Sequence, residues 1–292
     1  MALHPTLARL LTRRVVITDG AWGTQLQARG LSGGECPDAW NLSRPADVES
    51  VARAYVDAGS HVILTNTFRS NRLALAGYGL ANRVRELNVA GAQISLHATG
   101  AKALVFASMG PSGKMLMMGE TTEEELKAAF EEQAEALAEA GVHGLVVETM
   151  SDLAEAMIAV RAAKSTGLPV VASMVFDSGK NKDRTMMGQT VEQCAVALAD
   201  AGADVVGANC GRGIAGYLAL CQRLAQAASL PVWIKPNAGL PEFVDGKLIY
   251  QTTPDEFAGF APALMDAGAR FIGGCCGSTP EFIRALAAKV PA

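Results

Sequence analysis

Two adjacent cysteines near the end of the chain, Cys275 and Cys276, are the residues with the clearest chemical potential. They follow a short apolar run and lie between glycines in the segment FIGGCCGST. Neighbouring side chains of a regular strand point to opposite faces, but glycines allow backbone angles that can turn both sulfurs toward one point. A third cysteine, Cys210, ends another apolar run, DVVGANC. Three thiolates together favour zinc and leave one tetrahedral position open, as in catalytic zinc sites. The alternatives are a vicinal disulfide or three buried core thiols.

The elements that must position these cysteines are eight short runs rich in β-branched residues, which alternate with Ala-rich helical segments. The clearest helical segment, residues 121–140, begins with Thr121 or Thr122 as N-cap and has acids in its first turn. Several helices are expected to end at an Ala-Gly pair. This alternation predicts a parallel sheet, and eight units in 292 residues predict one (β/α)8 TIM barrel domain over residues 1–292. A doubly wound open sheet is the alternative, disfavoured because no GxGxxG follows the first strand. The eight runs begin at Val15, His61, Ala103, Gly144, Pro169, Asp204, Pro231 and Arg270.

A barrel of this kind has its active site at the C-terminal ends of the strands. The unusual residues of the sequence all fall there: Asp19, Glu148, Cys210, Asn237, Cys275 and Cys276. Asp19 and Glu148 could hold a substrate ammonium group, or they could cap helices or pair with a Lys or Arg. The segment GAWGT, with Trp22 and Gly23, could offer backbone N–H groups to a carboxylate, although a tight turn would also explain its glycines. Together these features describe a site for an amino-acid thiol.

The remaining cysteines and the histidines argue against other metal sites. Cys36 is expected in a loop, and Cys194 and Cys221 in helices, all in ordinary packing. His61 and His143 precede strands and would lie at the opposite end of the barrel, which disfavours a metal hydrolase with histidine ligands.

Composition excludes further classes of function. A net charge of −4 offers no basic surface for nucleic acid, and no apolar run is long enough to cross a membrane. Six cysteines without an export signal suggest the reducing cytoplasm. The first residues, MALHPTLARLLTRR, are expected to form a short capping helix rather than a transit peptide.

The motifs DGAWGT, TNTF, GPSG, ET at Glu148, GANCG, PNAG and GGCCG followed by TPE together resemble the zinc-dependent homocysteine S-methyltransferase family. The loop CPDAWNLSRPADV is most similar to the homocysteine module of cobalamin-dependent methionine synthase. The resemblance implies that Cys210, Cys275 and Cys276 bind zinc and that Asp19 and Glu148 bind the homocysteine amino group. It also implies that Asn237 holds the fourth zinc position when substrate is absent. The chain departs from the family at Phe282, where a His is common, and in the GRG after Cys210, where a GP is common.

The resemblance implies transfer of a methyl group to the thiol of homocysteine, giving methionine. A free thiol, with a pKa of about 8.5, is a poor nucleophile at neutral pH, and zinc would bind it as thiolate. The expected donor is a methylated corrinoid on a separate protein. S-Methylmethionine, S-adenosylmethionine or a betaine would be the alternatives. From another class of function, a non-catalytic zinc or thiol redox sensor remains an alternative.

Overall fold

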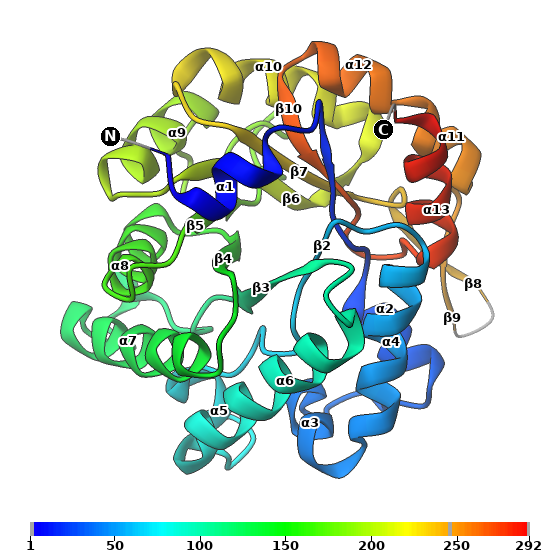
Figure 1. Ribbon diagram of the computed structural model, residues 1–292. Coiled ribbons are helices and arrows are strands. Elements are labelled where there is room, and N and C mark those ends of the chain that lie inside the picture. The colour runs from blue at the N-terminus through cyan, green and yellow to red at the C-terminus, as the bar shows by residue number, and fades with distance from the viewer. Residues whose placement is uncertain (1–2, 245–246, 291–292) are drawn as a thin grey trace.

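Eight parallel strands form a barrel in the computed structural model, which describes residues 3–244 and 247–290 (Figure 1). Hydrogen bonding runs in the order β1-β10-β7-β6-β5-β4-β3-β2, and a parallel bridge between Thr18 and Val62 brings the two edges together. All eight predicted runs form strands, so the barrel is confirmed and the open doubly wound alternative is wrong. The strands are β1 (Val16–Ile17), β2 (Val62–Ile63), β3 (Leu104–Met109), β4 (Gly144–Met150), β5 (Val170–Met174), β6 (Val205–Gly213), β7 (Val232–Asn237) and β10 (Ala269–Ile272).

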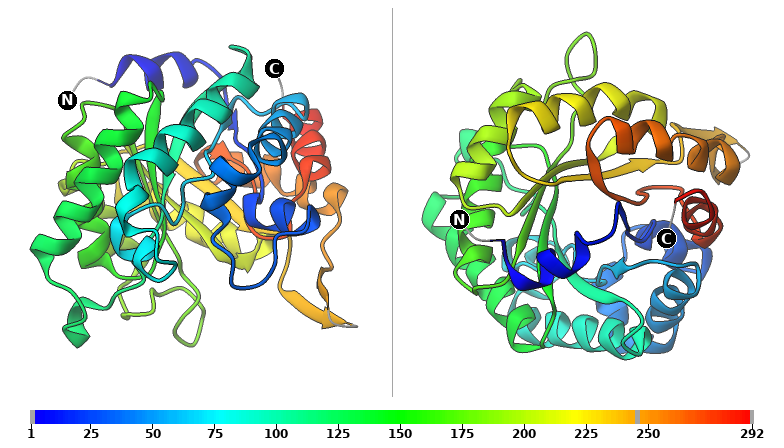
Figure 2. Two further views of the ribbon diagram at one scale, coloured as in Figure 1. Left: turned by 90° about the horizontal axis from the view of Figure 1, so that it is seen from below. Right: turned by 45° about the horizontal axis from the view of Figure 1, so that its top comes forward.

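Helices surround the strands (Figures 1 and 2). They are α1 (Pro5–Leu10), α2 (Trp22–Ala28), α3 (Trp40–Ser43), α4 (Pro45–Asp57), α5 (Arg72–Ala76), α6 (Val84–Thr99), α7 (Glu123–Glu139), α8 (Leu153–Lys164), α9 (Val191–Asp200), α10 (Tyr217–Ala227), α11 (Pro254–Gly259), α12 (Ala261–Asp266) and α13 (Pro280–Lys289). Within the described ranges, none of these helices has the length and apolar character needed to cross a bilayer.

Local sequence signals decide where these helices begin and end. In α7 the N-cap is Thr122, whose side chain accepts from the Glu125 backbone while Glu125 reaches back to the N-cap N–H. The expected Ala-Gly ends are also present, because Gly59, Gly141 and Gly202 have φ between 88° and 104°. Only glycine adopts this backbone conformation without strain.

The barrel interior is filled by an apolar layer to which every strand contributes. This layer includes Phe106, Val146 and Trp233, and it is closed at the N-terminal end by Leu7 and Leu10 of α1. Helix α1 is the predicted N-terminal capping helix, and it lies across the end opposite the projecting β8–β9 hairpin (Figure 2).

The two histidines predicted at the stability face are confirmed there. His61 Nδ1 accepts the Ile17 amide at 3.0 Å, and His143 Nδ1 accepts the Val105 amide at 3.1 Å. Both rings therefore satisfy strand amides at the N-terminal end of the barrel.

An antiparallel hairpin after β7, formed by β8 (Pro241–Val244) and β9 (Lys247–Tyr250), was not predicted. Its sequence nevertheless carries a hairpin signal, since Asp-Gly lies between the two short segments PEFV and KLIY. The ring of Tyr250 lies against Gly277, where an added Cβ would fall 2.3 Å from the ring. The hairpin thus explains why a glycine must follow the cysteine pair.

Candidate metal centre and substrate cavity

The three predicted cysteines converge at the C-terminal end of the barrel. The sulfurs of Cys210, Cys275 and Cys276 all lie within 4.8 Å of one another, and the Cys210–Cys276 pair is 3.9 Å apart. A tetrahedral site with Zn–S bonds of about 2.3 Å places its sulfurs about 3.8 Å apart. A disulfide would need about 2.05 Å, and all six cysteines are free thiols. The spacing therefore fits a metal.

Backbone geometry, not strand periodicity, brings the sulfurs together. Cys210 has a φ of 63°, a left-handed conformation that is uncommon for a residue with a side chain and is often found at functional sites. The Cys275 amide donates to the Pro236 carbonyl at 2.7 Å, and the Cys276 carbonyl accepts from the Ala238 amide at 2.9 Å. These bonds fix the cysteine pair to the end of β7.

A polar side chain from β6, Asn209, ties the ends of two other strands to the thiols. Its Oδ1 accepts from the Thr149 amide at 2.9 Å and from Ser173 Oγ at 2.7 Å. Its Nδ2 donates to Thr149 Oγ1 at 2.6 Å and faces Cys275 Sγ at 3.8 Å. The Asn209 side chain thus connects the ends of β4 and β5 to Cys275 of the three-cysteine cluster.

Asn237, the expected fourth ligand, ends β7 beside Cys210. Its side chain contributes to lowering the Cys210 pKa, and its Oδ1 is buried without a hydrogen-bond partner. An unpartnered buried oxygen is costly, and this one, on a side chain beside Cys210, would make a fourth donor together with the three thiols. The residues present therefore fit zinc.

The three thiols also change one another's pKa values. Hydrogen bonds with Cys275 and Cys276 lower the pKa of Cys210, while the hydrogen bond with Cys210 raises the pKa of both partners. A thiolate at Cys210 is therefore stabilised by the two thiols beside it. Metal binding would remove the remaining thiol protons, because zinc binds cysteine as thiolate.

A cavity of about 330 Å³ opens onto the three sulfurs. Its volume is in the range of small-molecule sites. Its wall includes the predicted residues Trp22, Gly23 and Glu148 together with the three cysteines, and also Asp38, Phe68, Arg69, Ser108 and Lys235.

The polar wall of this cavity lies directly above the apolar layer of the barrel. Side chains two residues apart on a strand share a face. Ser108, Glu148 and Lys235 are each two residues beyond a member of the apolar layer, so they face the barrel interior one level closer to the thiols. Glu148 accepts a hydrogen bond from Ser108 Oγ at 2.5 Å. Burial raises the Glu148 pKa, and Lys235 and Ser108 partly offset that rise.

Asp19 is placed differently from the other predicted residues. It is fully buried and does not line the cavity. Its Oδ2 accepts from Trp22 Nε1 and from the Leu64 amide, both at 2.7 Å, and its Oδ1 accepts from Lys235 Nζ at 2.5 Å. The pairing with a lysine, which the sequence left open, is therefore present, and the Asp19 carboxylate is engaged by the protein itself.

Lys235 is the main charged residue of the site that sequence reasoning missed. Its side chain is 3% exposed. Burial lowers its pKa, but Asp19 and Glu148 raise it by more, so the pKa lies above the ordinary value and the amine stays charged. The sequence did carry a signal for it, since a lysine stands inside the apolar strand run VWIKPN. Lysines are almost never fully buried unless they are paired, so a buried partner with negative charge could have been expected.

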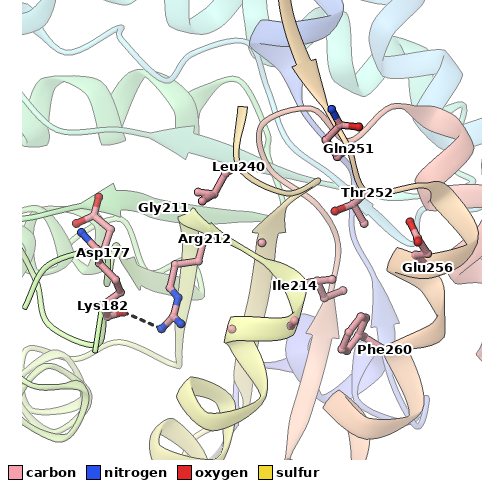
Figure 3. Close-up of a pocket in the computed structure, with 13 residues that line it drawn as sticks. Asp177, Lys182, Gly211, Arg212, Ile214, Leu240, Gln251, Thr252, Glu256 and Phe260 are labelled. Atoms are coloured by element: carbon pink, nitrogen blue, oxygen red, sulfur yellow. Dashed lines mark hydrogen bonds between the residues drawn. The ribbon is translucent and has the colours of Figure 1, made fainter. Parts of the chain in front are cut away.

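A second, larger cleft lies beside the cluster. It measures about 890 Å³ and is bordered by Gly211 and Arg212, which directly follow Cys210 (Figure 3). Arg212 Nη1 donates to the Lys182 carbonyl at 2.8 Å, and Leu240 and Phe260 form apolar parts of the wall (Figure 3). The Arg of the GRG departure thus belongs to this cleft. The other departure, Phe282, packs edge-to-face on Phe257 at 5.4 Å between ring centroids.

The fold and the site define a TIM barrel with a three-thiol metal-type centre at its catalytic face. Residues 16–290 match the family model described as homocysteine S-methyltransferase, and the chain belongs to that family. It is 34% identical over 305 aligned residues to a methionine synthase of Mycobacterium tuberculosis and 33% identical to one of Mycobacterium leprae. These alignments cover 97% of this chain but 25% of each relative, so the chain spans about a quarter of their length.

Solved structures give the same fold. The metallated and oxidized forms of the homocysteine methyltransferase MmuM from Escherichia coli each match with a TM-score of 0.82. Both are 24% identical to this chain and cover 98% of it and 100% of their own chain. At this identity the match supports the barrel architecture.

Proposed function

We propose that this protein transfers a methyl group to the thiol of homocysteine and releases methionine, with zinc held by Cys210, Cys275 and Cys276. The observation that carries the proposal is the convergence of three thiols on a cavity that also contains a buried carboxylate, Glu148. When bound, zinc would hold the substrate sulfur as thiolate and keep it nucleophilic at neutral pH. The thiol proton would leave to solvent as the sulfur binds, and the sulfur would then bond to the methyl carbon while the electron pair of the carbon–donor bond leaves with the donor.

The protein's part in this reaction is to hold and orient the substrate. Asn237 occupies the side of the cluster next to Cys210 and would yield its position to the incoming sulfur. Trp22 is held in place through its bond to Asp19 and, with Gly23, forms one wall of the cavity. Fixed geometry of this kind lowers the barrier, because the reacting atoms must approach to about 3–3.5 Å.

X-ray absorption at the zinc edge tests the proposal. Homocysteine should raise the number of sulfur ligands from three to four. A redox sensor, which the 3.9 Å separation of two sulfurs would also suit, should instead lose zinc and form a disulfide under mild oxidant.

Glu148 is proposed to bind the substrate ammonium, because Asp19 does not line the cavity and Glu148 does. Glu148→Gln keeps the shape of the side chain and removes its charge. The loss of a charge-assisted hydrogen bond costs roughly 1.5–3 kcal/mol, so homocysteine affinity should fall about ten- to a hundredfold with zinc content unchanged. Isothermal titration calorimetry measures the affinity.

Asp177→Asn is the matched control for Glu148, since Asp177 lines the neighbouring cleft and not the substrate cavity. It should bind homocysteine like the wild type. The ammonium assignment fails if wild-type protein binds 4-mercaptobutyrate, which lacks the amino group, as tightly as homocysteine.

The proposed donor is a methylated corrinoid. The likeness of the CPDAW loop to the cobalamin-dependent branch and the open 890 Å³ cleft next to Cys210 support a large donor. Exposed apolar side chains on the loops that follow β3 and β7, Met117, Met118 and Leu240, support a protein partner at this face. Among the described residues of the cavity wall the aromatic ones are Trp22 and Phe68, too few for the aromatic cage that a betaine favours.

A donor panel tests this assignment. Methionine formation from homocysteine is expected with methylcobalamin and not with S-adenosylmethionine, S-methylmethionine or glycine betaine. The product is measured by liquid chromatography with each donor supplied alone. Turnover with a small sulfonium or ammonium donor, and none with methylcobalamin, would overturn the donor assignment and leave the thiolate chemistry in place.

A further inference from the structure

Lys235 brings a positive charge into the cavity directly below the metal-type cluster. Trp233, Lys235 and Asn237 alternate along β7, so their side chains share the face that lines the barrel interior. Trp233 belongs to the apolar layer, and Asn237 lies beside Cys210. Two residues of strand span roughly 6.6 Å, which sets Lys235 one level below the thiols.

The hydrogen-bonding capacity of this ammonium is only partly used. A lysine ammonium has three N–H donors. In the part of the chain that the structure describes, its hydrogen-bond acceptor is Asp19 Oδ1 at 2.5 Å. Two donors on a buried charge are therefore available on a side chain that lines the cavity. A buried charge with unused donors is costly unless a ligand completes it.

Glu148 provides the complementary charge on β4, which is separated from β7 by strands β5 and β6. An amino acid carries one ammonium and one carboxylate. Bound between Glu148 and Lys235, it would extend the existing ion pair into an alternating row: Asp19, Lys235, ligand carboxylate, ligand ammonium, Glu148. Each charge in this row would have an opposite neighbour, which buried charges require.

We propose that Lys235 binds the carboxylate of the amino-acid thiol and that Asp19 is the positioning residue that holds its ammonium in the cavity wall. This assignment rests on the proposed function, because it takes an amino-acid thiol as the substrate. It replaces the backbone N–H groups of the GAWGT turn as the principal carboxylate anchor.

The test compares two ligands that differ only at the acid end, homocysteine and homocysteinamide, by calorimetry on the zinc-loaded protein. Wild type should bind homocysteine about ten- to a hundredfold more tightly, as expected for a charge-assisted contact. Lys235→Met should lose that preference and bind both ligands alike. Arg69→Gln is the matched control, since Arg69 is the other cation of the cavity wall and is exposed at its rim. It should keep the preference.

Lys235→Met leaves the buried Asp19 carboxylate without its partner and could therefore destabilise the fold. A second variant, Asp19→Asn with Lys235→Met, removes both charges and avoids this loss of stability. The proposal is overturned if either Lys235 variant retains the preference for homocysteine, if Arg69→Gln loses it, or if wild type shows none. If the Lys235 variants kept the preference for homocysteine and Arg69→Gln lost it, the substrate carboxylate would instead bind Arg69 at the rim of the cavity. Zinc content and methionine formation by the wild type report on the proposed function separately, so the two failures are distinguishable.

Discussion

Replacing any one of Cys210, Cys275 and Cys276 by alanine is expected to remove bound zinc and reduce methyl transfer to the background rate. The wild type should carry about one zinc per chain, and each variant close to none, by elemental analysis of protein kept reduced. Two thiolates and a neutral amide are a poor set for zinc, because catalytic zinc sites are held by three ligands drawn from Cys, His, Asp and Glu. Substrate thiolate then has no metal to stabilise it.

The barrel should survive these substitutions. The bonds that fix the cysteine pair to β7 are made by the backbone amide of Cys275 and carbonyl of Cys276, and alanine keeps both. Circular dichroism should therefore show the wild-type spectrum. Cys221→Ala is the control, because Cys221 lies on α10 and packs against α12, away from the three-cysteine cluster. Its Sγ is 3.7 Å from the Leu264 carbonyl. It should retain zinc and activity, and full zinc content in Cys275→Ala would refute the ligand assignment.

Asp19→Asn is expected to lower the free energy of unfolding by about 3–5 kcal/mol, because it leaves the buried Lys235 ammonium without its ion-pair partner. That is a large share of the 5–15 kcal/mol of a typical protein. Urea unfolding followed by circular dichroism measures the loss. Zinc content at low temperature should not change, since Asp19 contacts Trp22, Leu64 and Lys235 and no cysteine.

Removing both charges should restore most of this stability. The double variant Asp19→Asn with Lys235→Met leaves neither member of this pair behind as a lone charge, and replacement of a buried pair by neutral groups is often neutral. Asp266→Asn is the control, because its pair with Arg14 is exposed at 76% and 65% and should contribute little. Equal stability of Asp19→Asn and wild type would show that the pair is not needed to hold the fold.

The sequence by itself determined the barrel fold and which residues lie at the C-terminal ends of its strands. Apolar runs and helix caps are local signals, so the eight strands and the Thr122 start of α7 could be predicted from neighbouring residues alone. A parallel barrel then brings the C-terminal ends of all strands to one face. For that reason Cys210 and the cysteine pair could be placed together without any knowledge of their contacts, although Cys210 and Cys275 are 65 positions apart in the sequence.

Only the tertiary structure decided the roles of the charged residues at that rim. Asp19 and Glu148 looked equivalent, because each ends an apolar strand. Their difference comes from Lys235, which lies 216 residues from Asp19 in the sequence. Lys235 binds the Asp19 carboxylate, which does not line the cavity, whereas Lys235 does line it. The direction of Cys210 likewise depends on a left-handed backbone angle that a regular strand would not predict. Strand periodicity says which face a side chain shares, but a buried charge settles on whichever partner the closed barrel brings within hydrogen-bond distance, and that partner is set by packing across the barrel.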